Sequence, residues 1–174
     1  MRRQLALPFR KPVILMTPKI GLKHPYYRSP FKDFHLGTAF KRAIPEEGPA
    51  SINPCEVKKL IFCSGKVAIT IDELRKEAKC EDKIAMCRIE QIYPFPYDII
   101  LQEFAKYENA KVCFVQEEHK NQGPLPFCRP RIENLLGKKI PVICRPPSSA
   151  SATGIKWLHQ KELKELKDKI IKFE

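Results

Sequence analysis

Regular hydrophobic patterning begins at Val57 and continues to the end of the chain. Short apolar runs, typical of buried strands, alternate with segments in which apolar residues recur at helical spacing. The predicted strands are residues 57–63, 83–89, 110–115 and 140–144. The predicted helices are residues 69–78, 97–107, 130–136 and 157–173. This alternation predicts a mostly parallel α/β sheet covered by helices, and Pro141 favours an edge position for the last strand.

The first 54 residues have a different character. They contain half of the sixteen prolines and one short apolar run, residues 13–16. Prolines at this density break helices and central strands. We therefore expect an extended arm, or the remnant of another domain, over residues 1–54, and a globular domain over residues 55–174. No further strand-like run is expected before residue 57.

Charge is distributed unevenly between these two parts. Residues 1–45 hold ten Lys/Arg and one acid, Asp33, whereas residues 46–154 hold sixteen bases and fifteen acids. A nucleic-acid-binding fold would carry its basic patch on the folded domain, so we expect no nucleic-acid partner. The basic arm could still bind phosphate or dock on an acidic partner surface. No apolar run approaches transmembrane length, so we expect no membrane partner.

The seven cysteines indicate free thiols in a reducing compartment. Their number is odd, no secretory signal is evident, and no Cys-x-x-Cys pair occurs. Cys63, Cys87, Cys113 and Cys144 each lie inside an apolar stretch. Such thiols are typical of a core, and we predict no metal site.

Polar and charged side chains follow the predicted strands. In a parallel sheet, ligands and partner groups gather beyond the carboxyl ends of the strands. A possible anion- or regulator-binding edge consists of Lys66, Arg88, Lys120 and Arg145. A possible domain-contact edge consists of Glu90, Gln91, Gln116, Glu117 and Glu118. The alternative is that these positions are polar only because edge loops are solvated.

The local motifs predict neither a catalytic nor a cofactor-binding residue. Ser64-Gly65-Lys66 is not a phosphate-binding loop, because Leu60 and Val67 stand where that motif needs Gly and Ser or Thr. No dinucleotide fingerprint and no Gly-x-Ser-x-Gly occur. His119 would need a partner and a pocket to act as a general base. We expect it to be a surface-loop histidine, and we expect the same of the remaining histidines, His24, His35 and His159.

Several long strings of residues resemble one known family. They are FCSGKV (62–67), RIEQIYPFP (88–96), KYENAKVCFVQEEHKNQG (106–123) and RPPSSASATG (145–154), followed by His159. They are similar to the C-terminal domain of 2-oxoglutarate dehydrogenase, the thiamine-dependent first component of its complex. The strings RRQLALPFRKPVILMTPK (2–19) and GTAFKRAIPE (37–46) resemble the end of the preceding pyrimidine-binding domain and its linker.

This resemblance implies a transketolase-like fold: a three-layer sandwich with a mostly parallel sheet of about five strands, one of them an antiparallel edge strand. It also implies the mitochondrial matrix, the citric acid cycle and a homodimer working with a dihydrolipoyl succinyltransferase. The family's full-length members use thiamine diphosphate and magnesium. The resemblance further makes residues 13–17 the last strand of a pyrimidine domain, so we expect a poorly packed arm or an extended segment there.

The chain departs from the family in what it lacks. It contains no Gly-Asp-Gly, which begins the family's metal motif, and most of the pyrimidine domain has no counterpart. Because the cofactor performs the chemistry in such enzymes, we expect no cofactor in this chain and no decarboxylation by it alone. The chain would then be a truncated piece, or a short paralogue retained as an assembly or regulatory module. The alternative is a subunit that takes part in decarboxylation when combined with the cofactor domains of a full-length homologue.

Overall fold

The computed structural model describes residues 2–14, 17 and 19–173, in two compact units, Met1–Thr38 and Ala39–Glu174. The first unit contains a short helix, α1 (Arg2–Leu5), and single 3-10 turns η1 (Lys19–Leu22), η2 (Pro25–Tyr27) and η3 (Phe31–Phe34). Val13, Ile14 and Thr17 lie in no helix or strand, and residues 15 and 16 of the expected strand are outside the described residues. Large apolar side chains such as Ile14, Phe31 and Leu36 are exposed, as expected of a poorly packed arm.

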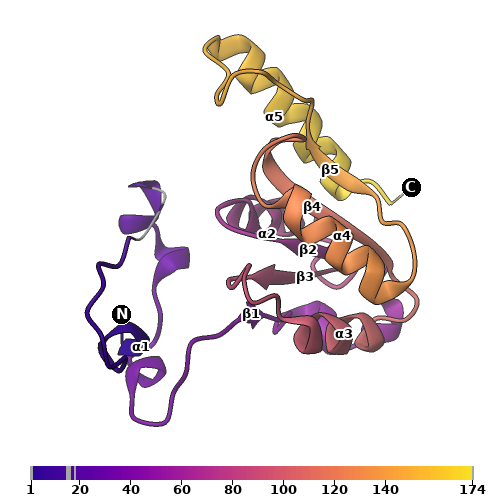
Figure 1. Cartoon of the computed structure of the whole chain (residues 1–174). Helices are drawn as coiled ribbons and strands as arrows, with labels where there is room; N and C mark the ends of the chain where they lie inside the picture. The colour runs from indigo at the N-terminus through magenta and orange to yellow at the C-terminus, as the bar shows by residue number, and fades with distance from the viewer. Residues whose placement is uncertain (1, 15–16, 18, 174) are drawn as a thin grey trace. The chain divides into compact units, whose positions relative to one another are not determined.

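The second unit is built on a five-stranded sheet with the strand order β1-β3-β2-β4-β5 (Figure 1). Its strands are β1 (Ala43–Ile44), β2 (Lys59–Cys63), β3 (Ile84–Ile89), β4 (Lys111–His119) and β5 (Val142–Arg145). Strands β2 to β5 run parallel to one another, and β1 pairs antiparallel with β3. The predicted mostly parallel sheet is confirmed, and so is the edge position of its last strand.

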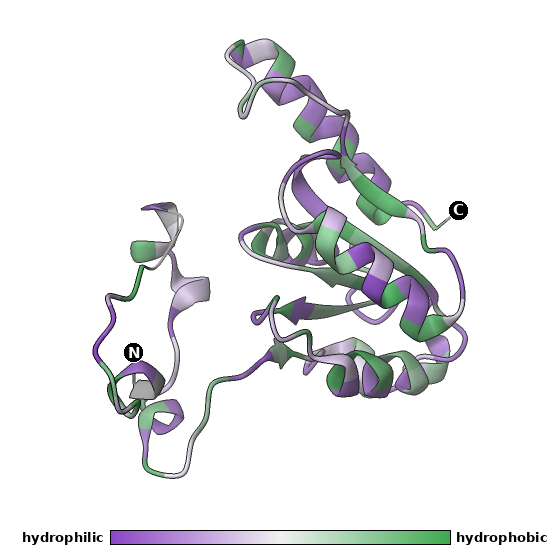
Figure 2. Ribbon diagram, viewed as in Figure 1, coloured by the Kyte–Doolittle hydropathy of each residue, from purple (hydrophilic) through white to green (hydrophobic). Residues whose placement is uncertain are grey.

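Helices cover both faces of this sheet, which makes a three-layer α/β sandwich. Their bounds are α2 (Val67–Glu77), α3 (Tyr97–Lys106), α4 (Leu125–Leu136) and α5 (Lys156–Ile171). One apolar core joins α3 and α4 to the sheet, and a second core joins α2 and α5 to the opposite face. The middle parts of the central strands are hydrophobic because both of their faces are buried, whereas the ends of β3 and β4 carry polar residues (Figure 2). Among the described residues, no helix combines the length and the apolar character needed to span a membrane.

The structure differs from the sequence prediction at three places. Strand β1 was not expected, because two residues are too few to show a period. Strand β4 continues through the polar residues Gln116 to His119, where the predicted strand ended at Val115. Helix α4 begins at Leu125 although Pro126 and Pro130 lie within it, whereas the sequence suggested a start at Pro130. Pro126 stands in the first turn, where the missing N–H costs nothing. The predicted glycine stop is confirmed, since Gly137 ends α4 at φ 63°.

Beyond the short β1, a buried ion pair covers the outer edge of β3. The Glu46 carboxylate accepts from the N–H of Met86 at 2.9 Å and pairs with Arg75 of α2. Arg75 also donates to the carbonyl of Ile84 at 2.7 Å. Burial acts to lower the pKa of Arg75, but Glu46 and Asp72 outweigh it and raise that pKa. Side chains thus satisfy the backbone groups that a longer β1 would have paired.

Candidate functional site

The carboxyl ends of β2 to β5 form one edge of the sheet, which we call the strand-end edge. Because these strands are parallel, the candidate residues that follow them belong to this edge. Lys66 precedes the first turn of α2, and its ammonium lies 2.9 Å from the Glu117 carboxylate of β4. The structure therefore brings together two of the predicted residues, one from each of the two proposed sets, as an ion pair.

A second ion pair lies at the end of β3. The guanidinium of Arg88 is 2.5 Å from the carboxylate of Glu90. The backbone N–H groups of Glu90 and Gln91 both donate to the carbonyl of Arg42, at 3.0 and 2.8 Å, which ties this turn to the start of β1. The Gln91 amide donates to the carbonyl of Pro94 at 2.9 Å. Of the four predicted cations, Lys66 and Arg88 therefore each have a carboxylate partner within the chain.

Gln116 was expected on the domain-contact edge, but it is fully buried. Its amide nitrogen donates to the carbonyls of His119 and Gln122 at 2.9 and 2.8 Å, and its oxygen accepts from the N–H of Leu125 at 2.9 Å. It thereby links the end of β4, the following turn and the first residue of α4. Gly123, with φ 67°, completes this turn, where a Cβ would lie 3.0 Å from Glu118.

His119 is a buried residue of β4, so the expectation of a surface loop was wrong. Its Nδ1 lies 2.6 Å from the carbonyl oxygen of Pro146, so in the neutral ring this nitrogen carries the proton and donates it. Nε2 is buried without a hydrogen-bond partner among the described residues. The residues around His119 are polar, so its burial could not be predicted from the sequence. The register shift between β4 and β5 lies in the same segment and interrupts the regular strand pattern there.

Arg145 is also buried, with 8% of its surface exposed. Its guanidinium donates to the carbonyl of Glu117 at 2.7 Å, to the hydroxyl of Thr153 at 3.2 Å and to the Glu162 carboxylate at 3.4 Å. It also lies 3.4 Å from Nδ1 of His159, which belongs to helix α5 and not to a surface loop as expected. Arg145 thus connects three elements: β4, α5, and the loop that lies between β5 and α5. Of the four predicted cations, only Lys120 is an exposed side chain without an ion pair in the described chain.

The buried cysteines have the character that the sequence predicted. All seven are free, and Cys63, Cys87 and Cys113 are buried in three central strands. Burial raises the pKa of Cys63 and of Cys113 to about 12 in each case, and that of Cys87 further still. Such thiols stay protonated and serve as apolar core groups. Of the four cysteines predicted in the core, Cys144 of β5 is the exception, because it is partly exposed.

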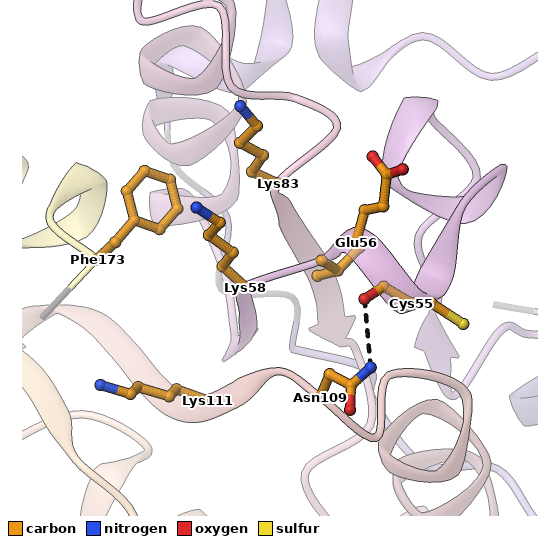
Figure 3. A pocket seen from close by; sticks show the side chains of 8 residues that line it. Cys55, Glu56, Lys58, Lys83, Asn109, Lys111 and Phe173 are labelled. Atoms are coloured by element: carbon orange, nitrogen blue, oxygen red, sulfur yellow. Dashed lines mark hydrogen bonds between the residues drawn. The ribbon is translucent and has the colours of Figure 1, made fainter.

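A hollow at the opposite, amino-terminal ends of the strands was missed by the sequence analysis (Figure 3). It has a volume of about 530 Å³ and is lined in part by Glu56, Lys58, Lys83, Asn109, Lys111 and Phe173. The ammonium of Lys58 lies 5.9 Å from the centre of the Phe173 ring. Next to it, Lys59 is buried and donates to the carbonyl of Ile170 at 2.9 Å, at the end of α5. The only signal in the sequence is a lysine before each of three apolar runs, which is also common at the solvated starts of strands.

Comparison with known proteins places the chain within one family. A family profile described as 2-oxoglutarate dehydrogenase C-terminal matches residues 28–171. The mitochondrial 2-oxoglutarate dehydrogenase of Caenorhabditis elegans is 46% identical over 173 residues, or 98% of this chain and 17% of its own length. The mitochondrial 2-oxoglutarate dehydrogenase-like protein of Rattus norvegicus is 45% identical over 170 residues, again 17% of its own length.

Two further similarities are more distant. A rat protein named 2-oxoadipate dehydrogenase complex component E1 is 41% identical over 93% of this chain and 18% of its own length. A solved structure described as a split-gene transketolase, an inactive β4 tetramer, aligns with a TM-score of 0.49 at 14% identity, over 79% of this chain and 43% of its own. The chain spans 17% of the length of the two 2-oxoglutarate dehydrogenase relatives named above. The match to the family profile and the identity over nearly the whole length show that the chain belongs to the 2-oxoglutarate dehydrogenase C-terminal family.

Proposed function

We propose that this chain acts as the C-terminal assembly and regulatory module of a 2-oxoglutarate dehydrogenase-type subunit and is not catalytic on its own. The observation that carries the proposal is the pairing of charges at the strand-end edge, Lys66 with Glu117 and Arg88 with Glu90. Acid–base catalysis needs a group that is free to exchange a proton with a substrate. An edge whose charges neutralise one another suits a polar contact between domains, which is typically more polar than an obligate interface.

The contact would use the exposed residues of this edge. Glu90, Glu118 and Lys120 are exposed, and the Lys66–Glu117 pair is partly so. The partner surface would be the cofactor domains of a full-length homologue, and through them the dihydrolipoyl succinyltransferase of the complex. The names of the Caenorhabditis elegans and Rattus norvegicus 2-oxoglutarate dehydrogenase relatives describe them as mitochondrial, and we propose the mitochondrial matrix for this chain as well.

Calorimetry with thiamine diphosphate and magnesium separates the module from an enzyme. We expect no heat of binding from this chain alone, and binding only after the cofactor domains of a full-length homologue are added. Detectable binding by the isolated chain would contradict the module and favour the alternative of direct participation in decarboxylation. Assembly is then measured by co-sedimentation, where Glu90→Lys with Glu118→Lys should weaken the association and Glu165→Lys, on the exposed face of α5, should not.

The same edge is our proposed site for an anionic regulator. A phosphate group at Lys66 or Arg88 would compete with Glu117 or Glu90, whereas Lys120 is accessible without such competition. A thermal-shift titration with a nucleotide or an acyl-coenzyme A tests the site. Lys66→Ala and Lys120→Ala should each reduce the ligand-induced shift, and unchanged affinity in both would remove the proposal. Arg145→Ala needs a separate folding control, because Arg145 also holds α5 to the sheet.

A further inference from the structure

The outer edge of β5 is an open sheet edge that lies in a groove. β5 is the last strand in the sheet order, and in Figure 1 it lies at the margin of the sheet, next to α5. The groove has a volume of about 400 Å³, and its lining includes Val142 and Cys144 of β5, Lys120 after β4, Arg129 of α4 and Lys169 of α5. An extended segment would have both a row of backbone groups to pair with and walls on either side.

The register shows which backbone groups of β5 are unpaired. Phe114 donates its N–H to the carbonyl of Pro141 and is the ladder partner of Val142. In a parallel ladder the backbone groups of alternate residues point to the same side. Those of Pro141 and Ile143 therefore face β4, and those of Val142 and Cys144 face outward. No hydrogen bond to these outward groups occurs among the described residues.

Pro141 does not protect this edge. Prolines at sheet edges commonly remove a donor that would attract another strand. The carbonyl of Pro141, however, faces β4, so its ring nitrogen faces β4 as well and the missing N–H is one of the inner ladder. The outward N–H groups of Val142 and Cys144 remain available to an incoming strand.

The chain itself shows which chemistry suits the edge. Two residues before Val142, the N–H of Ile140 donates to the Glu133 carboxylate at 3.0 Å. That carboxylate also lies 2.9 Å from Arg129 and 3.3 Å from Lys139. The N–H of Ile140 is the main reason that the pKa of Glu133 falls to about 2, with burial opposing it and the two cations adding to it. An acidic group is therefore already bound at the beginning of this edge.

Further along, the lining of the groove contains three cations, Lys120, Lys169 and Arg129, and no acid. Arg129 pairs with Glu133, whereas Lys120 and Lys169 have no ion pair among the described residues. Lys120, Lys169 and Arg129 all lie near the Cys144 thiol, where they oppose the burial that raises its pKa. We propose that this groove binds an acidic segment of a partner protein, which adds to the sheet in extended conformation as a strand beside Val142–Arg145. Backbone hydrogen bonds would supply affinity, and the cationic frame would select the charge of the segment.

Two other occupants fit the charges less well. A second copy of the chain, paired through β5, would bring Lys120, Arg129 and Lys169 against the same three cations. The chain's own first 45 residues hold ten Lys/Arg and one acid, so they carry the wrong sign. The surplus of cations thus favours an acidic segment from another protein.

The test uses the full chain and a short blocked peptide that alternates glutamate with valine, with a lysine–valine peptide as its matched control. We expect the acidic peptide to bind, the basic one not to bind, and binding to slow amide hydrogen exchange at Val142 and Cys144. Lys120→Glu combined with Lys169→Glu should weaken binding by about tenfold, because two frame charges are reversed. Lys164→Glu, an exposed position on α5 outside the groove, should leave it unchanged.

Each contrary outcome overturns a stated part of the proposal. Absence of acidic-peptide binding, or equal binding of both peptides, would exclude the acidic partner. Binding without protection of Val142 and Cys144 would show a surface charge effect in place of an added strand. Protection that rises with protein concentration in the absence of peptide would identify a second copy as the occupant. Val142→Pro removes one outward donor and should weaken peptide binding by about fivefold, which tests the backbone pairing independently of charge.

Discussion

The β3 side and the β5 side of the sheet differ in how their outward backbone groups are satisfied. At the β3 side, the short β1 pairs with Arg88 and Ile89. Glu46 and Arg75 satisfy the backbone groups of Met86 and Ile84, which precede them in β3. At the β5 side, Glu133 satisfies only the N–H of Ile140, and the outward groups of Val142 and Cys144 have no partner in the described chain. One edge is closed by buried side chains, whereas the other is framed by cations and left open. The difference indicates that the β3 edge serves stability and the β5 edge is available for contact.

Breaking the closed edge should have the largest effect. Glu46→Ala leaves buried Arg75 with Asp72 as its one remaining carboxylate partner among the described residues, and it leaves the N–H of Met86 unpaired. We expect the free energy of unfolding to fall by about 3–5 kcal/mol, the range for breaking one partner of a buried ion pair. Denaturant unfolding followed by circular dichroism measures it. Glu47→Ala, at an exposed neighbouring position, is the control; an equal loss there would mean that the edge is not closed by this pair.

A proline at the open edge should cost much less. Val142→Pro removes an N–H that faces outward, so no ladder hydrogen bond is lost, and we expect a change of about 1 kcal/mol or less. The matched variant is Met86→Pro, whose N–H donates to Glu46, where a loss of about 3 kcal/mol or more is expected. Equal losses in the two variants, measured by the same unfolding experiment, would contradict the contrast between the edges.

At the β5 side, Glu133 confers a pH dependence on the stability of the chain. Its folded-state pKa is lowered from 4.5 to about 2, so its contribution to stability is present above pH 4.5 and is lost as the pH falls toward about 2. The melting temperature of Glu133→Gln should therefore lie below that of the unmodified chain at neutral pH and approach it near pH 2. Glu165→Gln, an exposed position of α5, provides the control. A difference that does not change with pH would show that the charge of Glu133 is not what holds Ile140.

The sequence predicted the framework of the second unit with few errors. Each predicted parallel strand is present, and so is each predicted helix, because continuous apolar runs and helical spacing report burial directly. Strand β1 was missed since two residues carry no period. The early start of α4 was missed because Pro126 and Pro130 suggested a later one.

The candidate site was less predictable than the fold. The sequence placed the candidate residues after the strand ends, and the parallel strands bring these ends to one edge of the sheet. It could not show that Lys66 pairs with Glu117, or that Gln116, His119 and Arg145 are buried. Polar residues in a polar stretch look solvent-exposed, and only the folded backbone supplies the carbonyl and N–H groups that make their burial tolerable.

The sequence by itself determined the alternating strands and helices, the near-neutral charge of the folded part, the core thiols and the resemblance to one family. These properties depend on local pattern or on composition. The tertiary structure alone decided which charges neutralise one another and which sheet edge is closed. Such outcomes depend on partners far apart in the chain, such as Glu46 with Arg75 and Arg145 with Glu162, whose proximity no local pattern encodes.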